Sequence, residues 1–186
     1  MCIRDRVAAR TGAGIVISPR LADTPEEIAD AEYVAYAGLR SAERARTEGV
    51  SAPVYIDALA FPAISDPVRC VRALATLRGW ARVEHAEPLL AIGNVSYGAT
   101  GALASTLRAT YAAAAIGAGA RALILPVEDA RTLDAIRLAL GERPATSIED
   151  TWLLDVTTAC RTGGVPGTAP PTYVEAARLL FGGNAG

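Results

Sequence analysis

The sequence is poor in aromatic residues and has little excess of either charge. Aromatic residues make up 5% of its 186 residues, although 51% of the residues are hydrophobic. The 18 basic and 20 acidic residues give a net charge of −2 and form no long run of like charges. Without a basic tract, nucleic acid is not an expected partner. The low aromatic content favours helices packed on buried parallel strands over an antiparallel sandwich.

Cysteine pairs and long apolar runs are also scarce. The three cysteines, Cys2, Cys70 and Cys160, have no spacing typical of a zinc or redox motif, and their odd number argues against a disulfide framework. The longest apolar stretch, Tyr111–Ile116, is far shorter than the roughly 20 residues that span a bilayer. No signal-peptide core follows Met1. We therefore expect a cytoplasmic protein with no membrane partner.

Common catalytic and cofactor motifs are missing as well. The single histidine, His85, lies in the polar segment 82–87, where we expect a loop residue rather than a base or a metal ligand. No G-x-G-x-x-G motif follows an expected strand, and the glycines at 163–167 follow a helical pattern instead of preceding one. These features argue against a nucleotide-binding loop. No cluster of side chains predicts a protein-bound metal.

The first six residues, MCIRDR, are what a transposase adapter used in sequencing libraries encodes when it is read in this frame. We therefore interpret residues 1–6 as a scar and exclude them from the fold prediction. The reading frame would then have been entered partway through a longer gene. An N-terminally truncated fragment is expected.

Short apolar runs alternate with helical patterns along residues 7–144. The expected strands are Ala13–Ser18, Val54–Phe61, Leu89–Val95 and Ala122–Leu125. The expected helices run from a capping box at 24–27 to Gly49, onward from Asp66-Pro67, over Leu103–Ile116, and from Asp129 to Leu140 before Gly141. This alternation predicts βαβ units with a parallel sheet, in either a doubly wound sheet or a barrel.

The pattern changes after Gly141, and residues 145–186 are interpreted as a C-terminal helical extension. Trp152–Cys160 suggests a helix, although Trp152–Thr157 could instead be a strand. A Gly- and Pro-rich loop follows. Thr172 and Glu175 then predict a capping box that opens a last short helix.

In both parallel architectures, ligands bind at the carboxyl ends of the strands. The polar residues expected there are Ser18, Asp57, Asn94, Ser96, Glu128 and Asp129. Asp57 lies within an apolar run and would need a partner or backbone hydrogen bonds if it were buried. Asn94 offers one acceptor and two donors, or could simply form a turn before Gly98. Glu128 and Asp129 are most simply explained as acids at a helix start.

Taken in order, VYIDALAF, LLAIGNVSYG and the helix after them resemble the last strand regions of the pterin-binding (β/α)8 barrel superfamily. Residues 56–59, IDAL, are similar to the I-D-P-L strand of its methyltetrahydrofolate:corrinoid methyltransferases, and residues 93–96, GNVS, to their S-N-V-S strand end. The Ser-Arg-Lys and Arg-x-His motifs of dihydropteroate synthases are absent. The resemblance covers about Val7–Leu140. It implies the C-terminal half of a TIM barrel, strands five to eight.

The resemblance also implies a function, namely transfer of a methyl group from a methylated tetrahydropterin to a corrinoid carried by a partner protein. By this resemblance Asp57 would hydrogen-bond the pterin ring, and Ser96 would contribute to the same site. Asn94 would be the catalytic residue, with a hydrogen bond to the ring nitrogen that carries the methyl group. That bond would strengthen as charge develops in the transition state. No protein-bound metal is implied.

The sequence departs from the family at several points. Ala58 and Gly93 replace the usual Pro and Ser, and the segment after Gly98 lacks the usual Leu-Pro and Asn-Arg pairs. A dihydropteroate-synthase-like enzyme, a non-catalytic pterin- or partner-binding subunit, and an unrelated barrel therefore stay open as alternatives, as does a homodimer. Because the pocket would lack its N-terminal strands, the fragment alone is expected to be inactive.

Overall fold

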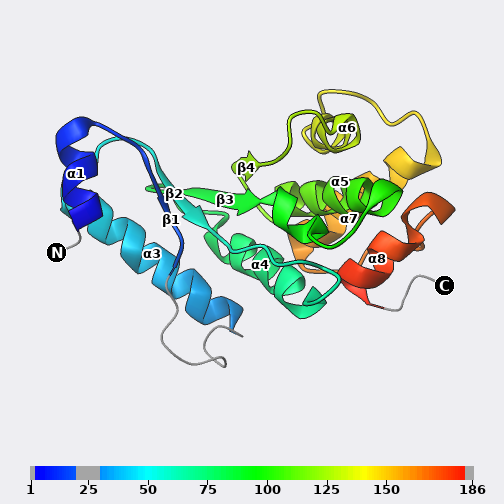
Figure 1. Ribbon diagram of the computed structural model, residues 1–186, viewed down its shortest axis with the longest axis horizontal. Helices are drawn as coiled ribbons and strands as arrows, with labels where there is room; N and C mark the ends of the chain where they lie inside the picture. Colours follow the sequence, from blue (N-terminus) through cyan, green and yellow to red (C-terminus); the bar gives the residue numbers. More distant parts are fainter. Residues whose placement is uncertain (1–2, 20–29, 183–186) are drawn as a thin grey trace.

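The computed structural model describes residues 3–19 and 30–182, and at its centre is a parallel sheet of four strands in the order β1-β2-β3-β4 (Figure 1). The strands are β1 (Ile15–Ile17), β2 (Val54–Asp57), β3 (Glu87–Ala91) and β4 (Ala122–Ile124). Their order increases in one direction only, whereas a doubly wound sheet reverses at a switch point. The fold is therefore α/β, with a topology compatible with part of a barrel.

A helix lies between each pair of successive strands, and within the described residues three further helices follow the last strand. Helix α1 (Ile3–Thr11) precedes β1 and includes residues that the sequence suggests are a scar. The helices after the four strands are α3 (Ala31–Thr47), α4 (Pro67–Trp80), α5 (Gly101–Gly117) and α6 (Ala130–Ala139). The last helices are α7 (Ile148–Thr162) and α8 (Val174–Phe181). In the described ranges, no helix combines the length and hydropathy needed to cross a bilayer.

Local signals explain where several helices begin and end. The Asp66 carboxylate accepts a backbone N–H of the first turn of α4 at 3.0 Å, as the Asp-Pro pair predicts. Helix α3 is capped in the same way by Asp30, while the capping box expected at 24–27 lies outside the described residues. Gly49 and Gly141 have positive φ just after α3 and α6, a conformation that glycine adopts without strain. These two predicted helix ends are confirmed.

All four strands are shorter than the sequence predicts, and β2 and β3 end several residues before the expected position. Strand β2 ends at Asp57 rather than Phe61. The expected strand Leu89–Val95 ends at Ala91, and the chain continues as the 3-10 turn η1 (Ile92–Ser96). Gly, Asn and Ser are poor strand formers, and the Ser96 hydroxyl donates to the Gly93 carbonyl at 3.1 Å within this turn. Local hydrogen bonding therefore replaces the extended backbone.

The C-terminal region is helical, and its apolar side chains join the same hydrophobic core as the sheet. Trp152, Val156 and Leu180 are buried in that core. Because Trp152–Thr157 lies within α7, the strand alternative for this segment is wrong. The predicted capping box at Thr172 is also wrong. The Thr172 hydroxyl donates to Glu149 at 3.4 Å, and α8 follows directly from the 3-10 turn η2 (Pro171–Tyr173) without a side-chain cap.

One face of the sheet packs against the helices, and within the described residues no helix lies over the other. Along β1, Ile15 and Ile17 are buried in the core, whereas Val16 between them is 48% exposed. Because parallel sheets are usually covered on both faces, the bare side is a distinctive feature. We call it the open face. By the sheet register it carries Val16, Tyr55, Asp57, Glu87, Leu89, Ala91, Ala122 and Ile124, of which Leu89 is nonetheless buried.

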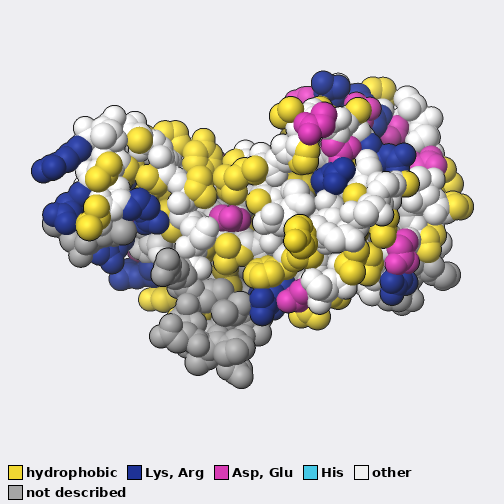
Figure 2. Space-filling model, viewed as in Figure 1, with side chains coloured by type: hydrophobic (Ala, Val, Ile, Leu, Met, Phe, Trp, Pro, Cys, Tyr) yellow, Lys and Arg dark blue, Asp and Glu magenta, His cyan; other side chains and the backbone are white. Residues whose placement is uncertain are grey.

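The molecule has an elongated, notched outline. In Figure 1, α1 and α6 lie on opposite sides of the notch, with β2 and β3 between them. In Figure 2 hydrophobic side chains border this notch, while charged side chains gather on the two flanking lobes. Apolar surface is therefore exposed near the middle of the molecule in this view.

Candidate functional site

Asp57 and Asn94 lie at the same edge of the sheet, where β2 and β3 end. Asp57 is the last residue of β2, and Asn94 lies in η1 directly after β3. Two backbone hydrogen bonds tie the loop after β2 to the neighbouring strand and turn. Ala58 donates to Leu89 within β3 at 3.0 Å, and Ala63 donates to Val95 in η1 at 2.9 Å. The sequence predicted both residues at strand ends, and the structure brings their two loops together.

Both side chains bind the short loop that follows β2. The backbone N–H of Leu59 donates to Asp57 Oδ1 at 3.0 Å, and Asn94 Nδ2 donates to the carbonyl oxygen of Ala60 at 3.4 Å. Between these bonds, Leu59 has φ +64°, and no other non-glycine residue in the described ranges has a positive φ. A left-handed leucine costs on the order of 1–3 kcal/mol and persists only where its surroundings enforce it. The two side-chain hydrogen bonds provide that constraint.

The Asp57 carboxyl is half-buried on the open face. Burial raises its pKa, and the hydrogen bond from the Leu59 N–H offsets only part of that shift. The backbone bond that sequence reasoning allowed for Asp57 is therefore present. Within the described ranges this is the only hydrogen bond to the carboxylate, so Oδ2 retains capacity for a ligand that carries N–H donors.

The Ser96 hydroxyl forms its hydrogen bonds within the protein. Ser96 is 7% exposed, donates to the Gly93 carbonyl, and accepts a hydrogen bond of 3.0 Å from Arg108 Nη1. Arg108 in turn donates from Nε to Asp129 Oδ2 at 2.5 Å. Sequence reasoning missed Arg108, although it is the only charged residue in the sequence of α5. A lone charge in an apolar helix was the available signal.

The remaining predicted candidates have simpler roles. Asp129 caps α6, as expected for an acid at a helix start. Burial tends to raise the pKa of its carboxyl, but hydrogen bonds from Arg108, Thr132 and Ser105 outweigh this and hold the pKa below its ordinary value. Glu128 is exposed in the loop between β4 and α6, and Ser18 is exposed directly after β1. The described hydrogen bonds connect neither of them to Asp57 or Asn94.

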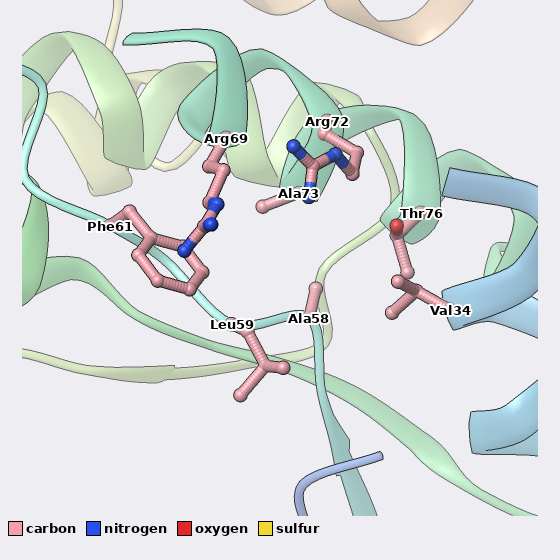
Figure 3. Close-up of a pocket in the computed structure, with 8 residues that line it drawn as sticks. All are labelled: Val34, Ala58, Leu59, Phe61, Arg69, Arg72, Ala73 and Thr76. Carbon is pink, nitrogen blue, oxygen red and sulfur yellow. The ribbon is translucent and has the colours of Figure 1, made fainter. Parts of the chain in front are cut away.

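A small cavity lies beside this edge, between the loop after β2 and helices α3 and α4 (Figure 3). Arg69 stacks on Phe61, with its guanidinium carbon 4.6 Å from the ring centre, and also binds Asp66 at 3.0 Å. Burial, followed by the nearby charge of Arg69, lowers the pKa of Arg72. The enclosed volume is about 10 Å³, enough for about one water molecule. A pterin ring does not fit there.

The opposite, amino edge of the sheet contains a structural clamp. Arg46 in the last turn of α3 donates to the carbonyl oxygens of His85, Val50 and Ala52 at 3.0, 2.8 and 2.7 Å. His85 is a loop residue before β3, as predicted, and lies far along the strands from the Asp57 edge. In the described ranges, no group of three or more His, Cys, Asp or Glu side chains is placed to hold a metal ion.

Compared with known proteins, the chain matches no family model and no curated protein. Its candidate site is therefore defined by geometry, namely Asp57 and Asn94 on adjacent strand ends, next to an open apolar sheet face.

Proposed function

We propose that the four strands form the C-terminal half of an eight-stranded (β/α) barrel, as strands five to eight. In a closed barrel, side chains from all eight strands fill the interior. Successive residues of the strands point alternately to the helices and to the open face. The open face would be the part of the barrel interior that these four strands contribute. The sequential parallel order of the strands supports the same interpretation.

We further propose that the site binds a pterin and serves methyl transfer from a methylated tetrahydropterin to the corrinoid of a partner protein. One observation carries this proposal, namely that Asp57 and Asn94, from the ends of adjacent strands, both bind the loop after β2 at the carboxyl edge. A carboxylate with a free oxygen suits the paired N–H donors of an aminopyrimidine ring. The Asn94 carboxamide lies across the loop after β2 from Asp57, where it can reach the second ring of the same pterin.

The chemistry assigned to Asn94 follows from the leaving group. As the bond between the pterin nitrogen and the methyl carbon breaks, its electron pair stays on nitrogen, which becomes more basic and takes up a proton from solvent. The second hydrogen of Asn94 Nδ2 would donate to this nitrogen, and the bond would strengthen as the transition state forms. The corrinoid of the partner protein would supply the nucleophile that takes the methyl group.

Calorimetric titration with a methylated tetrahydropterin, on the longest form of the protein that contains this chain, tests the proposal. Asp57→Ala should abolish most of the binding, because it removes the carboxylate that recognises the ring. Asn94→Ala should retain binding and slow methyl transfer to a cobalt(I) corrinoid by about 100-fold or more, the usual effect of losing one transition-state donor. Ser18→Ala, at a strand end without a described site contact, is the matched control.

The possible outcomes separate the alternatives. If the folded protein binds no pterin, both the methyl-transfer and the dihydropteroate-synthase-like hypotheses are excluded. Tight pterin binding without methyl transfer would instead support a non-catalytic pterin-binding subunit.

A further inference from the structure

A chain of polar contacts runs from the start of α6 to the turn that carries Asn94. At one end, the Asp129 carboxylate accepts four hydrogen bonds. Its Oδ1 accepts from Ser105 Oγ at 3.1 Å and the Thr132 N–H at 3.3 Å, and its Oδ2 accepts from Arg108 Nε at 2.5 Å and Thr132 Oγ1 at 2.8 Å. Both oxygens are therefore satisfied by the protein, and Asp129 has little capacity left for a ligand.

The other end of the chain reaches the candidate site. Arg108 Nη1 donates to Ser96 Oγ at 3.0 Å, and Ser96 Oγ donates to the carbonyl oxygen of Gly93, the residue before Asn94. The network is well shielded, with the Asp129 side chain 7% and the Arg108 side chain 19% exposed. Ion pairs and hydrogen bonds in such surroundings are stronger than those on an open surface.

We propose that Arg108 is a positioning residue that holds η1 in the conformation in which Asn94 faces the loop after β2. A 3-10 turn has poor internal hydrogen-bond geometry, so its conformation depends on contacts from outside the turn. Arg108 supplies such a contact through Ser96 and is itself fixed by Asp129. The inference rests on the proposed function, in that Asn94 is taken as the catalytic side chain.

Capping of α6 alone does not explain the network. Asp129 already caps the helix through the N–H and hydroxyl of Thr132. The hydrogen bond between Arg108 and Ser96 contributes nothing to that cap and instead fixes the β3 loop. The two functions can therefore be separated by substitutions at Ser96, which leave the α6 cap in place.

The composition of the chain provides a direct probe. The sequence contains no glutamine and two asparagines, Asn94 and Asn184. In an Asn184→Ala background, the single side-chain amide pair in a nitrogen-15 correlation spectrum belongs to Asn94. Its chemical shifts and exchange rate then report the position of this one carboxamide, whether or not a ligand binds.

In this background, Arg108→Met and Ser96→Ala should each shift the Asn94 amide signals and speed their exchange with solvent by about tenfold, as expected when a hydrogen-bonded turn opens locally. Ser96→Thr keeps the hydroxyl and should restore the wild-type signals. Arg137→Met, which removes an exposed ion pair with Asp134, is the matched control and should change nothing. Unchanged Asn94 signals in a folded Ser96→Ala variant would overturn the proposal.

Methyl transfer, measured on the longest form of the protein that contains this chain, adds a second measurement. Ser96→Ala should retain pterin binding but slow methyl transfer to a cobalt(I) corrinoid by about 10-fold, within the range typical of groups that orient a functional residue, and Ser96→Thr should restore the rate. If the wild-type protein binds no pterin, the proposed function fails while the spectroscopic result still decides whether Arg108 positions Asn94. If the wild type transfers the methyl group and both Ser96 variants do so equally fast, the positioning role is wrong and the proposed function stands.

Discussion

Asp57 and Asn94 hold one short loop from two neighbouring strands, Asp57 through the N–H of Leu59 and Asn94 through the carbonyl of Ala60. The left-handed backbone at Leu59 lies between these two contacts. A substitution at either residue therefore releases strain as well as removing a polar group. Measurements of ligand binding should be accompanied by a stability measurement for each variant.

The raised pKa of Asp57 predicts pH-dependent pterin binding. Burial places its pKa above the ordinary value, and N–H donors from a bound ring would favour the ionised carboxylate. Affinity should therefore be greatest above the pKa of the free site and fall, by up to about tenfold per pH unit, as the pH drops through it. Titrations between about pH 7 and 4 test this. In the Asp57→Asn variant only the ligand still titrates, so its affinity should depend less on pH. Equal pH dependence of affinity in the variant and the wild type would contradict the role of Asp57.

Helices α5 and α7 approach so closely at Gly117 that a Cβ there would overlap the carbonyl oxygen of Thr157. In an uncrowded helix, alanine in place of glycine stabilises by about 1 kcal/mol. At Gly117 the overlap should dominate, and Gly117→Ala should lower the free energy of unfolding by about 1–3 kcal/mol. Urea unfolding measures the change. Gly164→Ala, where the nearest atom to the new Cβ is 3.6 Å away, is the control and should have little effect.

The ion pair between Asp150 and Arg143 predicts acid sensitivity. Two hydrogen bonds of 2.7 and 2.8 Å from Arg143, with others from Thr146, hold the pKa of Asp150 far below its ordinary value despite some burial. A depressed folded-state pKa gives stability that is present above the unfolded pKa of about 4 and is lost as the pH falls below it.

Asp150→Asn should therefore be less stable than the wild type by about 1–3 kcal/mol at pH 7, and the difference should shrink as the pH falls below about 4. Unfolding curves at several pH values measure it. Asp134→Asn, in an exposed ion pair with Arg137, should cost less than about 1 kcal/mol. A constant difference between wild type and Asp150→Asn from pH 7 to 3 would be inconsistent with the ion-pair explanation.

The open face predicts self-association of the isolated chain. Val16 and Ile124 are 48% and 54% exposed on the two edge strands, which also present unpaired backbone groups. The double variant Val16→Lys with Ile124→Lys should reduce concentration-dependent association, as followed by light scattering after size-exclusion chromatography. Ile148→Lys replaces a residue 71% exposed on α7 and should leave association unchanged. An equal effect of both variants would rule out the open face as the cause.

The sequence allowed the strand–helix order to be predicted because its signals were local. Apolar runs, the Asp66-Pro67 cap and the glycine after α3 each act within a few residues. Thr172 shows the limit of such signals, since its hydroxyl bonds to Glu149, which is distant in sequence. The order of the strands, which is compatible with part of a barrel, is not encoded by any local pattern.

Part of the candidate site was predictable because it, too, rests on local sequence signals. Asp57 and Asn94 were identifiable because polar residues at the ends of apolar runs mark the carboxyl edge of a parallel sheet. The connection from Ser96 to Arg108 and Asp129 joins three separate segments, and only their packing reveals it. Ser96 was expected to face a ligand, but its position in the fold gives its hydroxyl two partners within the protein.

The Arg46 clamp lies at the amino edge, and the Asp57 loop lies at the other end of the same strands. A single guanidinium that binds three carbonyl oxygens secures the loops entering β2 and β3. Changes in the loops that leave these strands therefore need not disturb the connections that enter them. Such a division makes the scaffold evolvable, because ligand preference can diverge at one end while the other end preserves the register of the sheet.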